Sequence, residues 1–145
     1  RYMEPAVIAL AERVETDLLT LASSFTTNTP LGASGTAVTE ELIDQAETAL
    51  FQAKVPASMQ KNLVVDAATY SALRMNPRFS EYSRAGEAGL KTLIEGNIGR
   101  LKDFYVFRSQ FVRKTGTPVT TRNLAFAKDA IGLAIRRLPQ PLPGT

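Results

Sequence analysis

The first 25 residues carry one apolar stripe at the spacing of an α-helix. Its members follow one another at steps of 4, 3, 4, 4, 3 and 4 residues: Met3, Val7, Leu10, Val14, Leu18, Leu21 and Phe25. This period predicts a single long helix over 1–25, and Pro5 is tolerated because it falls in the first turn. A stripe of this kind packs either into the core of its own domain or along a coiled-coil seam, and we favour the core.

The next 50 residues predict a helix, a strand and a second helix after a polar loop at 26–38. Thr39 is placed to cap the first of these helices, with acidic residues near its positive end, and Val55-Pro56 ends it. Asn62 to Val65 is a short apolar strand. Asp66 then caps a helix that runs through Leu73.

The remaining residues predict short elements separated by loops. In chain order, they are a loop at 75–89, a helix at 90–95, a strand at 104–112, a turn at 115–121, a strand at 123–126, a helical turn at 128–131 and a strand at 132–138. The proline-rich tail after residue 138 cannot continue regular structure.

The segment EGNIGRLKDFYVFRSQFV, residues 95–112, admits two interpretations. Gly96-Asn97-Ile98-Gly99-Arg100 is similar to the loop with which KH domains clamp a nucleic-acid backbone. Alternatively, Gly96 and Gly99 let a strand begin beside another backbone, and that strand is apolar on both faces in its first half. Phe104 and Val106 would then face one side, with Tyr105, Phe107 and Phe111 on the other. We favour the structural interpretation.

Composition removes many kinds of chemistry. The chain has no Cys and no His, which excludes disulfides, thiolate nucleophiles, Ser-His-Asp relays and sites that need imidazole or sulfur ligands. We expect no catalytic residue, no metal and no cofactor, and so not an enzyme. With 44% apolar and 21% charged residues the chain is globular, and no uncharged run is fit to span a membrane.

Charge is distributed unevenly along the chain. Residues 1–73 carry four Lys or Arg against nine Asp or Glu, a net −5, whereas residues 74–145 carry thirteen against five, a net +8. The asymmetry is either chance scatter over a solvated surface or a pair of complementary faces that meet between copies or bind polyanions. Under the second interpretation the candidate interface residues are Arg74, Arg78, Arg84, Glu40, Glu41 and Asp44.

Five stretches, taken in order, resemble the central portion of a tailed-bacteriophage major capsid protein, whose coat fold is shared with encapsulin shells. They are RYMEPAVIALAERVETDLL, TEELIDQAETALFQAKVP, NLVVDAATYSALR, EGNIGRLKDFYVFRSQFV and NLAFAKDAIGLAIRRLP. The resemblance implies an α+β fold of the major-capsid type, with a long spine helix, an axial lobe of helices around a small mixed sheet, and an incomplete peripheral lobe. It divides the chain into a spine helix at 1–28, an axial domain at 29–116 and return strands at 117–145.

The same resemblance implies the function and the partners. The expected role is a structural subunit that self-assembles into hexamers and pentamers of an icosahedral shell, made in the bacterial cytoplasm and located in the virion. Partners would be other copies, scaffolding and portal proteins, and double-stranded DNA bound without sequence preference. The N-terminal arm and extended hairpin of this family are not in the sequence, so we expect a segment of a longer protein. An encapsulin-like shell and a nucleic-acid-binding module remain alternatives.

Overall fold

The computed structural model describes residues 3–24, 31–32, 36–77, 95–96, 98–116 and 119–134. Over these residues the chain is α+β, which confirms the predicted class. The elements are α1 (Met3–Thr20), η1 (Leu21–Ser24), α2 (Glu40–Gln52), β1 (Lys61–Val65), α3 (Ala67–Met75), β2 (Arg100–Leu101), β3 (Phe104–Arg108), β4 (Lys114–Thr115), β5 (Thr120–Thr121), β6 (Leu124–Ala127) and η2 (Lys128–Ala130). None of the helices in these ranges is long and apolar enough to cross a membrane.

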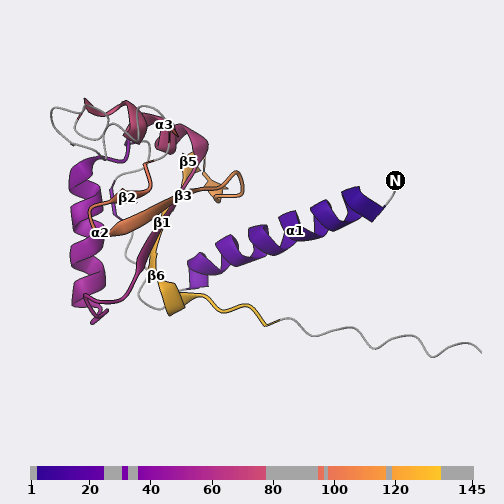
Figure 1. Cartoon of the computed structure of the whole chain (residues 1–145), viewed down its shortest axis with the longest axis horizontal. Coiled ribbons are helices and arrows are strands. Elements are labelled where there is room, and N and C mark those ends of the chain that lie inside the picture. The colour runs from indigo at the N-terminus through magenta and orange to yellow at the C-terminus, as the bar shows by residue number, and fades with distance from the viewer. Residues whose placement is uncertain are drawn as a thin grey trace, which may run out of the picture.

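A mixed four-stranded sheet forms the centre of the molecule, in the order β2-β3-β1-β6 (Figure 1). β1 is parallel to β3, with Leu63 opposite Val106, and antiparallel to β6, with Leu63 opposite Ala125. β2 and β3 form a tight antiparallel hairpin at one edge. A second, two-stranded sheet is made by β4 and β5.

One face of the four-stranded sheet is buried beneath α2 and α3, which lie beside it and above it in Figure 1. Side chains alternate between the two faces of a strand, so every second residue of β1 and β3 points into this layer. The core cluster consists of Ile43, Leu63, Val65, Tyr70, Leu73, Ile98, Leu101, Phe104 and Val106. Phe104 and Val65 are fully buried, so these two strands lie at the middle of the core.

Side-chain caps begin α2 and α3, as predicted. The Thr39 hydroxyl accepts from the Leu42 amide at 3.4 Å, and the Asp66 carboxylate accepts from the Thr69 amide at 2.8 Å. The end of α2 was not predicted in detail. The Val55 amide donates to the Leu50 carbonyl and the Lys54 amide to the Phe51 carbonyl, with Lys54 at φ +63°. This is a Schellman motif, so α2 ends at a left-handed lysine before Pro56 is reached.

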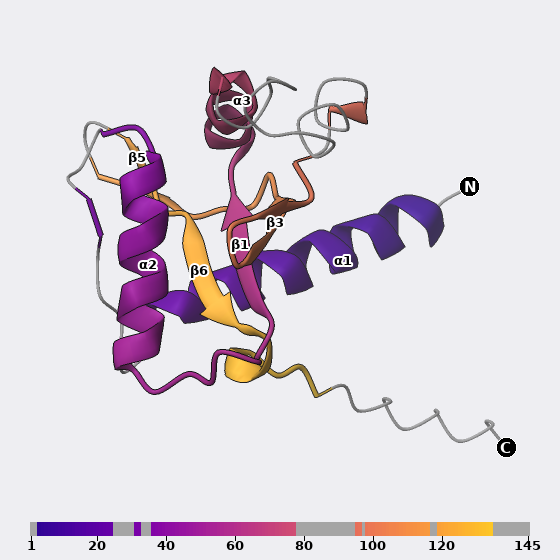
Figure 2. The same ribbon diagram turned by 60° about the vertical axis from the view of Figure 1, so that its left-hand side comes forward.

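The helical stripe of α1 is a real helix face but is not part of the core. Met3 is 80% exposed, and Val7, Leu10 and Leu21 are also exposed, whereas the one buried residue of α1, Leu19, lies off the stripe. Figure 1 shows α1 projecting away from the sheet with its C-terminal end beside it, and in Figure 2 its N-terminal half extends beyond the strands. The prediction that this stripe packs into the core of the chain is therefore wrong; Phe25 lies outside the described residues.

The strand predicted at 104–112 is correct only in its first half. β3 ends at Arg108, which pairs with Val65, the last residue of β1, and the Ser109 amide makes the last bond of this pair, to the Val65 carbonyl at 3.0 Å. Only one face of β3 is buried: Phe104 and Val106 lie in the core, whereas Tyr105 is exposed and Phe107 is 50% exposed. Both faces of this half are apolar, as predicted, but the face of Tyr105 and Phe107 is not buried.

Several shorter elements also differ from prediction. Residues 132–134 do not form the strand predicted at 132–138, whose last four residues lie outside the described ranges. The predicted helix at 90–95 lies outside them except for Glu95, and so does most of the loop at 75–89. The strands β4 and β5 were not predicted, since two-residue strands leave almost no periodic signal.

Candidate functional site

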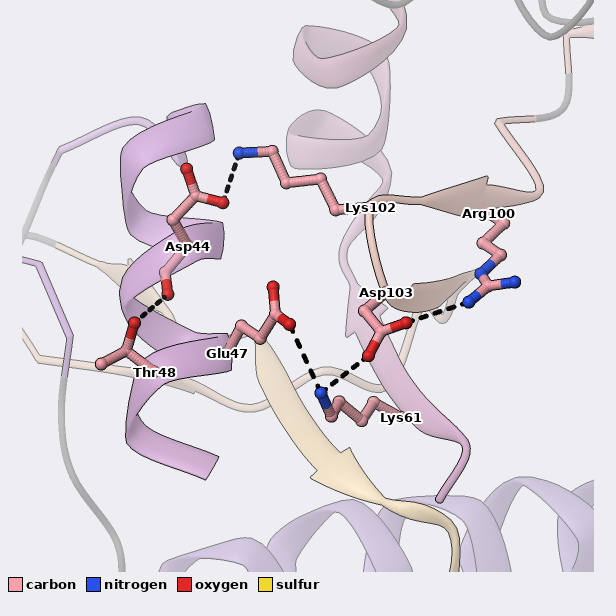
Figure 3. A network of polar contacts seen from close by, with 7 residues as sticks. All are labelled: Asp44, Glu47, Thr48, Lys61, Arg100, Lys102 and Asp103. Atoms are coloured by element: carbon pink, nitrogen blue, oxygen red, sulfur yellow. Dashed lines mark hydrogen bonds and ion pairs between the residues drawn. The ribbon is translucent and has the colours of Figure 1, made fainter. Parts of the chain in front are cut away.

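The acidic face of α2 and the turn between β2 and β3 form the most densely charged part of the described structure (Figure 3). Glu40, Asp44 and Glu47 follow one another by four and three residues, so they share one face of α2. Opposite them stand Lys102 and Asp103 of the turn, with Lys61 at the start of β1. Their ion pairs fix α2 over one end of the sheet.

Lys61 is the buried member of this charged cluster, with only 3% of its surface exposed. Its Nζ lies 2.7 Å from Asp103 Oδ2 and 3.5 Å from Glu47 Oε1. The other oxygen of Asp103 accepts from Arg100 Nη2 at 2.9 Å. Asp103 thus receives two cations at once, and Arg100 also lies over the Tyr105 ring with its guanidinium carbon 5.6 Å from the centroid.

These contacts shift the pKa values of the paired groups. The hydrogen bond from Lys61, followed by that from Arg100, lowers the pKa of Asp103. The hydrogen bond to Asp103 raises the pKa of Lys61 and outweighs the opposing cost of burial. For Lys102, desolvation lowers the pKa, but its bonds to Asp44 and Glu40 together more than offset it, and the pKa is raised. All three side chains are held in their charged forms at neutral pH.

The candidate interface residues differ in their surroundings: some are already paired within the chain, some are exposed, and some lie outside the described residues. Lys102 Nζ contacts both Glu40, at 3.4 Å, and Asp44, so these two carboxylates already have a cation in their own chain. Glu41 is exposed in the first turn of the same helix. Arg74 is exposed in the last turn of α3, near the glycine loop. Arg78 and Arg84 lie outside the described residues.

The loop of Gly96 and Gly99 is built into the core. Both glycines have positive φ, +65° and +64°, a conformation that other residues rarely adopt. Between them Ile98 is buried, and its amide donates to the Tyr70 hydroxyl at 3.0 Å, while that hydroxyl lies 3.3 Å from the Gly96 carbonyl. The Gly99 carbonyl accepts from the Val106 amide at 2.9 Å. The described part of this loop therefore joins α3 to β3.

Sequence reasoning missed the central residues of the charged cluster, Lys61 and the turn residues Lys102 and Asp103. One signal was available for Lys61, because residues 61, 63 and 65 share a face of β1, and two of them are apolar. A lysine on that face has to find a carboxylate. No local pattern, however, indicates which of the distant carboxylates it meets.

The fold is a small α+β domain: a mixed sheet with helices over one face and a further helix extending from its edge. No family model matches the sequence, and no curated protein does. In fold the chain is similar to a solved structure from Mycobacterium phage Che8, with a TM-score of 0.63 and 22% identity over 79% of this chain. The match covers 42% of that phage chain, so residues 1–145 correspond to less than half of its length.

Proposed function

We propose that the chain is part of a structural protein of a tailed bacteriophage, a major capsid subunit that assembles with copies of itself into an icosahedral shell. The observation that carries the proposal is the fold shared with the Che8 phage protein over 79% of the chain. The sequence resemblance supports the same proposal, because five stretches of the chain occur in the order in which a coat protein has them.

Two features of the described residues support a role in packing rather than in ligand binding. In the glycine loop the Ile98 amide and the Gly96 carbonyl bond to the Tyr70 hydroxyl, and the Gly99 carbonyl bonds to the Val106 amide. These bonds favour a structural role for the two left-handed glycines over a role in ligand binding. The exposed apolar side chains of α1 form a surface that a second polypeptide can cover. A shell subunit needs such surfaces, since each copy is held only by its neighbours.

In this proposal the subunits form hexamers and pentamers by heterologous contacts, with one face of a copy against a different face of the next. Contact with packaged double-stranded DNA would depend on charge alone and would weaken steeply with salt. Scaffolding and portal proteins are further candidate partners of such a shell.

The test is to express the complete reading frame that contains residues 1–145 and to examine the purified protein by negative-stain electron microscopy. Closed particles of uniform diameter are expected. A complete protein that stays monomeric over a range of concentration and salt, with no closed particles, would contradict the proposal. Residues 1–145 expressed alone serve as the control and are expected to form no closed shells, because they span less than half the length of the similar phage chain.

A further inference from the structure

The β4–β5 hairpin is a basic projection with an exposed apolar tip. Lys114 pairs with Thr121 in its ladder, and the Arg122 amide donates to the Arg113 carbonyl at 2.9 Å. Residues 113–122 contain three cations, Arg113, Lys114 and Arg122, and no acidic residue, and all three are exposed. Val119, next to the turn, is 70% exposed.

The root of this hairpin is fixed to the body of the molecule. Asn123 directly follows the hairpin, and its Oδ1 accepts from the Asp66 amide at 3.1 Å. Its Nδ2 donates to the Thr69 hydroxyl at 3.2 Å, so both ends of the amide hold the start of α3. Because the root of the hairpin is already held in place, it loses little entropy when the hairpin binds a partner.

The free half of α1 carries the complementary surface. Glu4, Ile8 and Glu12 are spaced by four residues and so form one row along the helix, with Ile8 53% exposed between the two carboxylates. Within the described ranges, no ion pair is formed by Glu4 or Glu12. Lys114 of the hairpin pairs with Asp66 of its own chain at 4.0 Å, so the hairpin offers the charges of Arg113 and Arg122, which equal in number the two carboxylates of the row.

These two surfaces face apart in a single copy. In Figure 2 β5 lies on one side of the body, and the N-terminal half of α1 extends to the opposite side. They do not meet within one chain in this structure. They can meet between chains, in the head-to-tail arrangement that repeats around a ring.

We propose that the β4–β5 hairpin of one copy docks on the Glu4–Ile8–Glu12 row of the next copy. Val119 packs on Ile8, and the flanking cations meet the two carboxylates. This inference rests on the proposed self-assembly and names the surfaces that carry it. A second copy fits the hairpin better than DNA does. It covers the apolar Ile8 and Val119 and neutralises the carboxylates of α1, whereas DNA would leave these side chains uncovered and the carboxylates unpaired.

A charge exchange between the two surfaces tests the proposal. One variant carries Arg113→Glu and Arg122→Glu, and the other carries Glu4→Lys and Glu12→Lys. Each alone is expected to weaken self-association roughly tenfold or more at low salt, as like charges then face each other. Mixed in equal amounts, the two variants are expected to recover the association of the parent chain, measured by sedimentation velocity. Circular dichroism checks that both remain folded.

The matched control for the hairpin variant is Lys54→Glu with Lys128→Glu, which changes the net charge equally at two exposed lysines on other surfaces. It is expected to associate as the parent does. A mixture that associates no better than either variant alone would refute the docking. Loss of double-stranded DNA binding by the hairpin variant, with unchanged self-association, would also refute it and assign the hairpin to DNA.

Disulfide trapping gives a second readout, because the chain has no cysteine of its own. An Ile8→Cys chain is mixed with a Val119→Cys chain and oxidised, and a mixed dimer is expected. Val119→Cys mixed with Leu133→Cys is the control, since Leu133 is exposed but lies outside both surfaces. Equal yields from the two mixtures would overturn the proposed contact.

The two proposals fail differently. If the complete protein forms closed shells even with Arg113→Glu and Arg122→Glu, the docking is wrong and the shell function stands. If the exchanged pair recovers association but the complete protein never closes into shells, the docking stands and the shell function is wrong.

Discussion

Lys61 is a buried charge that is stabilised by carboxylates from two other elements. Its side chain lies on the same face of β1 as Leu63 and Val65, where a charge would be strongly destabilising without partners. Asp103 and Glu47 supply those partners from the β2–β3 turn and from α2. The lysine therefore ties three elements together from inside the fold.

We predict that Lys61→Met lowers the free energy of unfolding by about 2 kcal/mol, because it removes a charge-assisted hydrogen bond at a buried site while keeping a side chain of similar length. The loss is no larger because Asp103 is about one-third exposed and retains Arg100. Urea unfolding measures the change. Lys128→Met, at an exposed lysine in η2, is expected to stay within about 0.5 kcal/mol of the parent. Equal losses in the two variants would contradict the prediction.

A second prediction concerns acid. The hydrogen bond from Lys61 and then that from Arg100 lower the pKa of Asp103 below its ordinary value of 3.8. Its stabilising effect is therefore complete above that value and is lost as the pH falls through the lower pKa of the folded state. The parent should be more stable than Asp103→Asn at about pH 6, and the difference should shrink towards about pH 3. Urea unfolding of both proteins at the two pH values measures it, and a difference independent of pH would be inconsistent with this ion pair.

At the scale of elements, the end of α2 is less stable than it could be. Lys54 occupies the left-handed position of the Schellman motif, where glycine is usual. Lys54→Gly should therefore raise the free energy of unfolding by about 1 kcal/mol. Lys54→Ala, which removes the same charge but keeps the Cβ atom, should give no such gain. Thermal unfolding of both variants measures the effect, and equal stabilities would show that the left-handed backbone at this position carries no cost.

The success of sequence reasoning also differs from element to element. Caps are local, so Thr39 and Asp66 were enough to locate the starts of α2 and α3. The stripe of α1 correctly predicted a helix, but periodicity says nothing about what covers a face. The end of β3 coincides with the end of its partner β1, whose last residue, Val65, pairs with Arg108 and lies more than 40 residues earlier in the chain. The ion pairs of Lys61 are non-local for the same reason.

At the scale of the whole molecule, α1 is joined to the body mainly through its C-terminal end. Glu15 bonds to the Ser109 hydroxyl just after β3, and Leu19 is buried one turn later, whereas the residues before Val14 are exposed. A helix without tertiary packing is only marginally stable in water.

Amide hydrogen exchange should therefore be fast over 3–12 and slow in β1 and β3 when the chain is dilute and monomeric. Raising the concentration should slow exchange over 3–12 if a second copy covers this half of α1. The strands β1 and β3 serve as the internal control. Protection over 3–12 equal to that of β1 in the dilute monomer would contradict the exposure of the helix.

The parallel pairing of β1 with β3 has a consequence for how the chain acquires its structure. Lys61 lies opposite Phe104, so the central pair of the sheet closes over 43 positions of the chain, and β6 joins only after a further segment. Contacts this distant in sequence slow folding, because the loop has to be closed before they form. During synthesis, α1 and α2 emerge long before any strand partner for β1 exists, so the nascent protein has to carry its apolar surfaces uncovered until residue 108 is made.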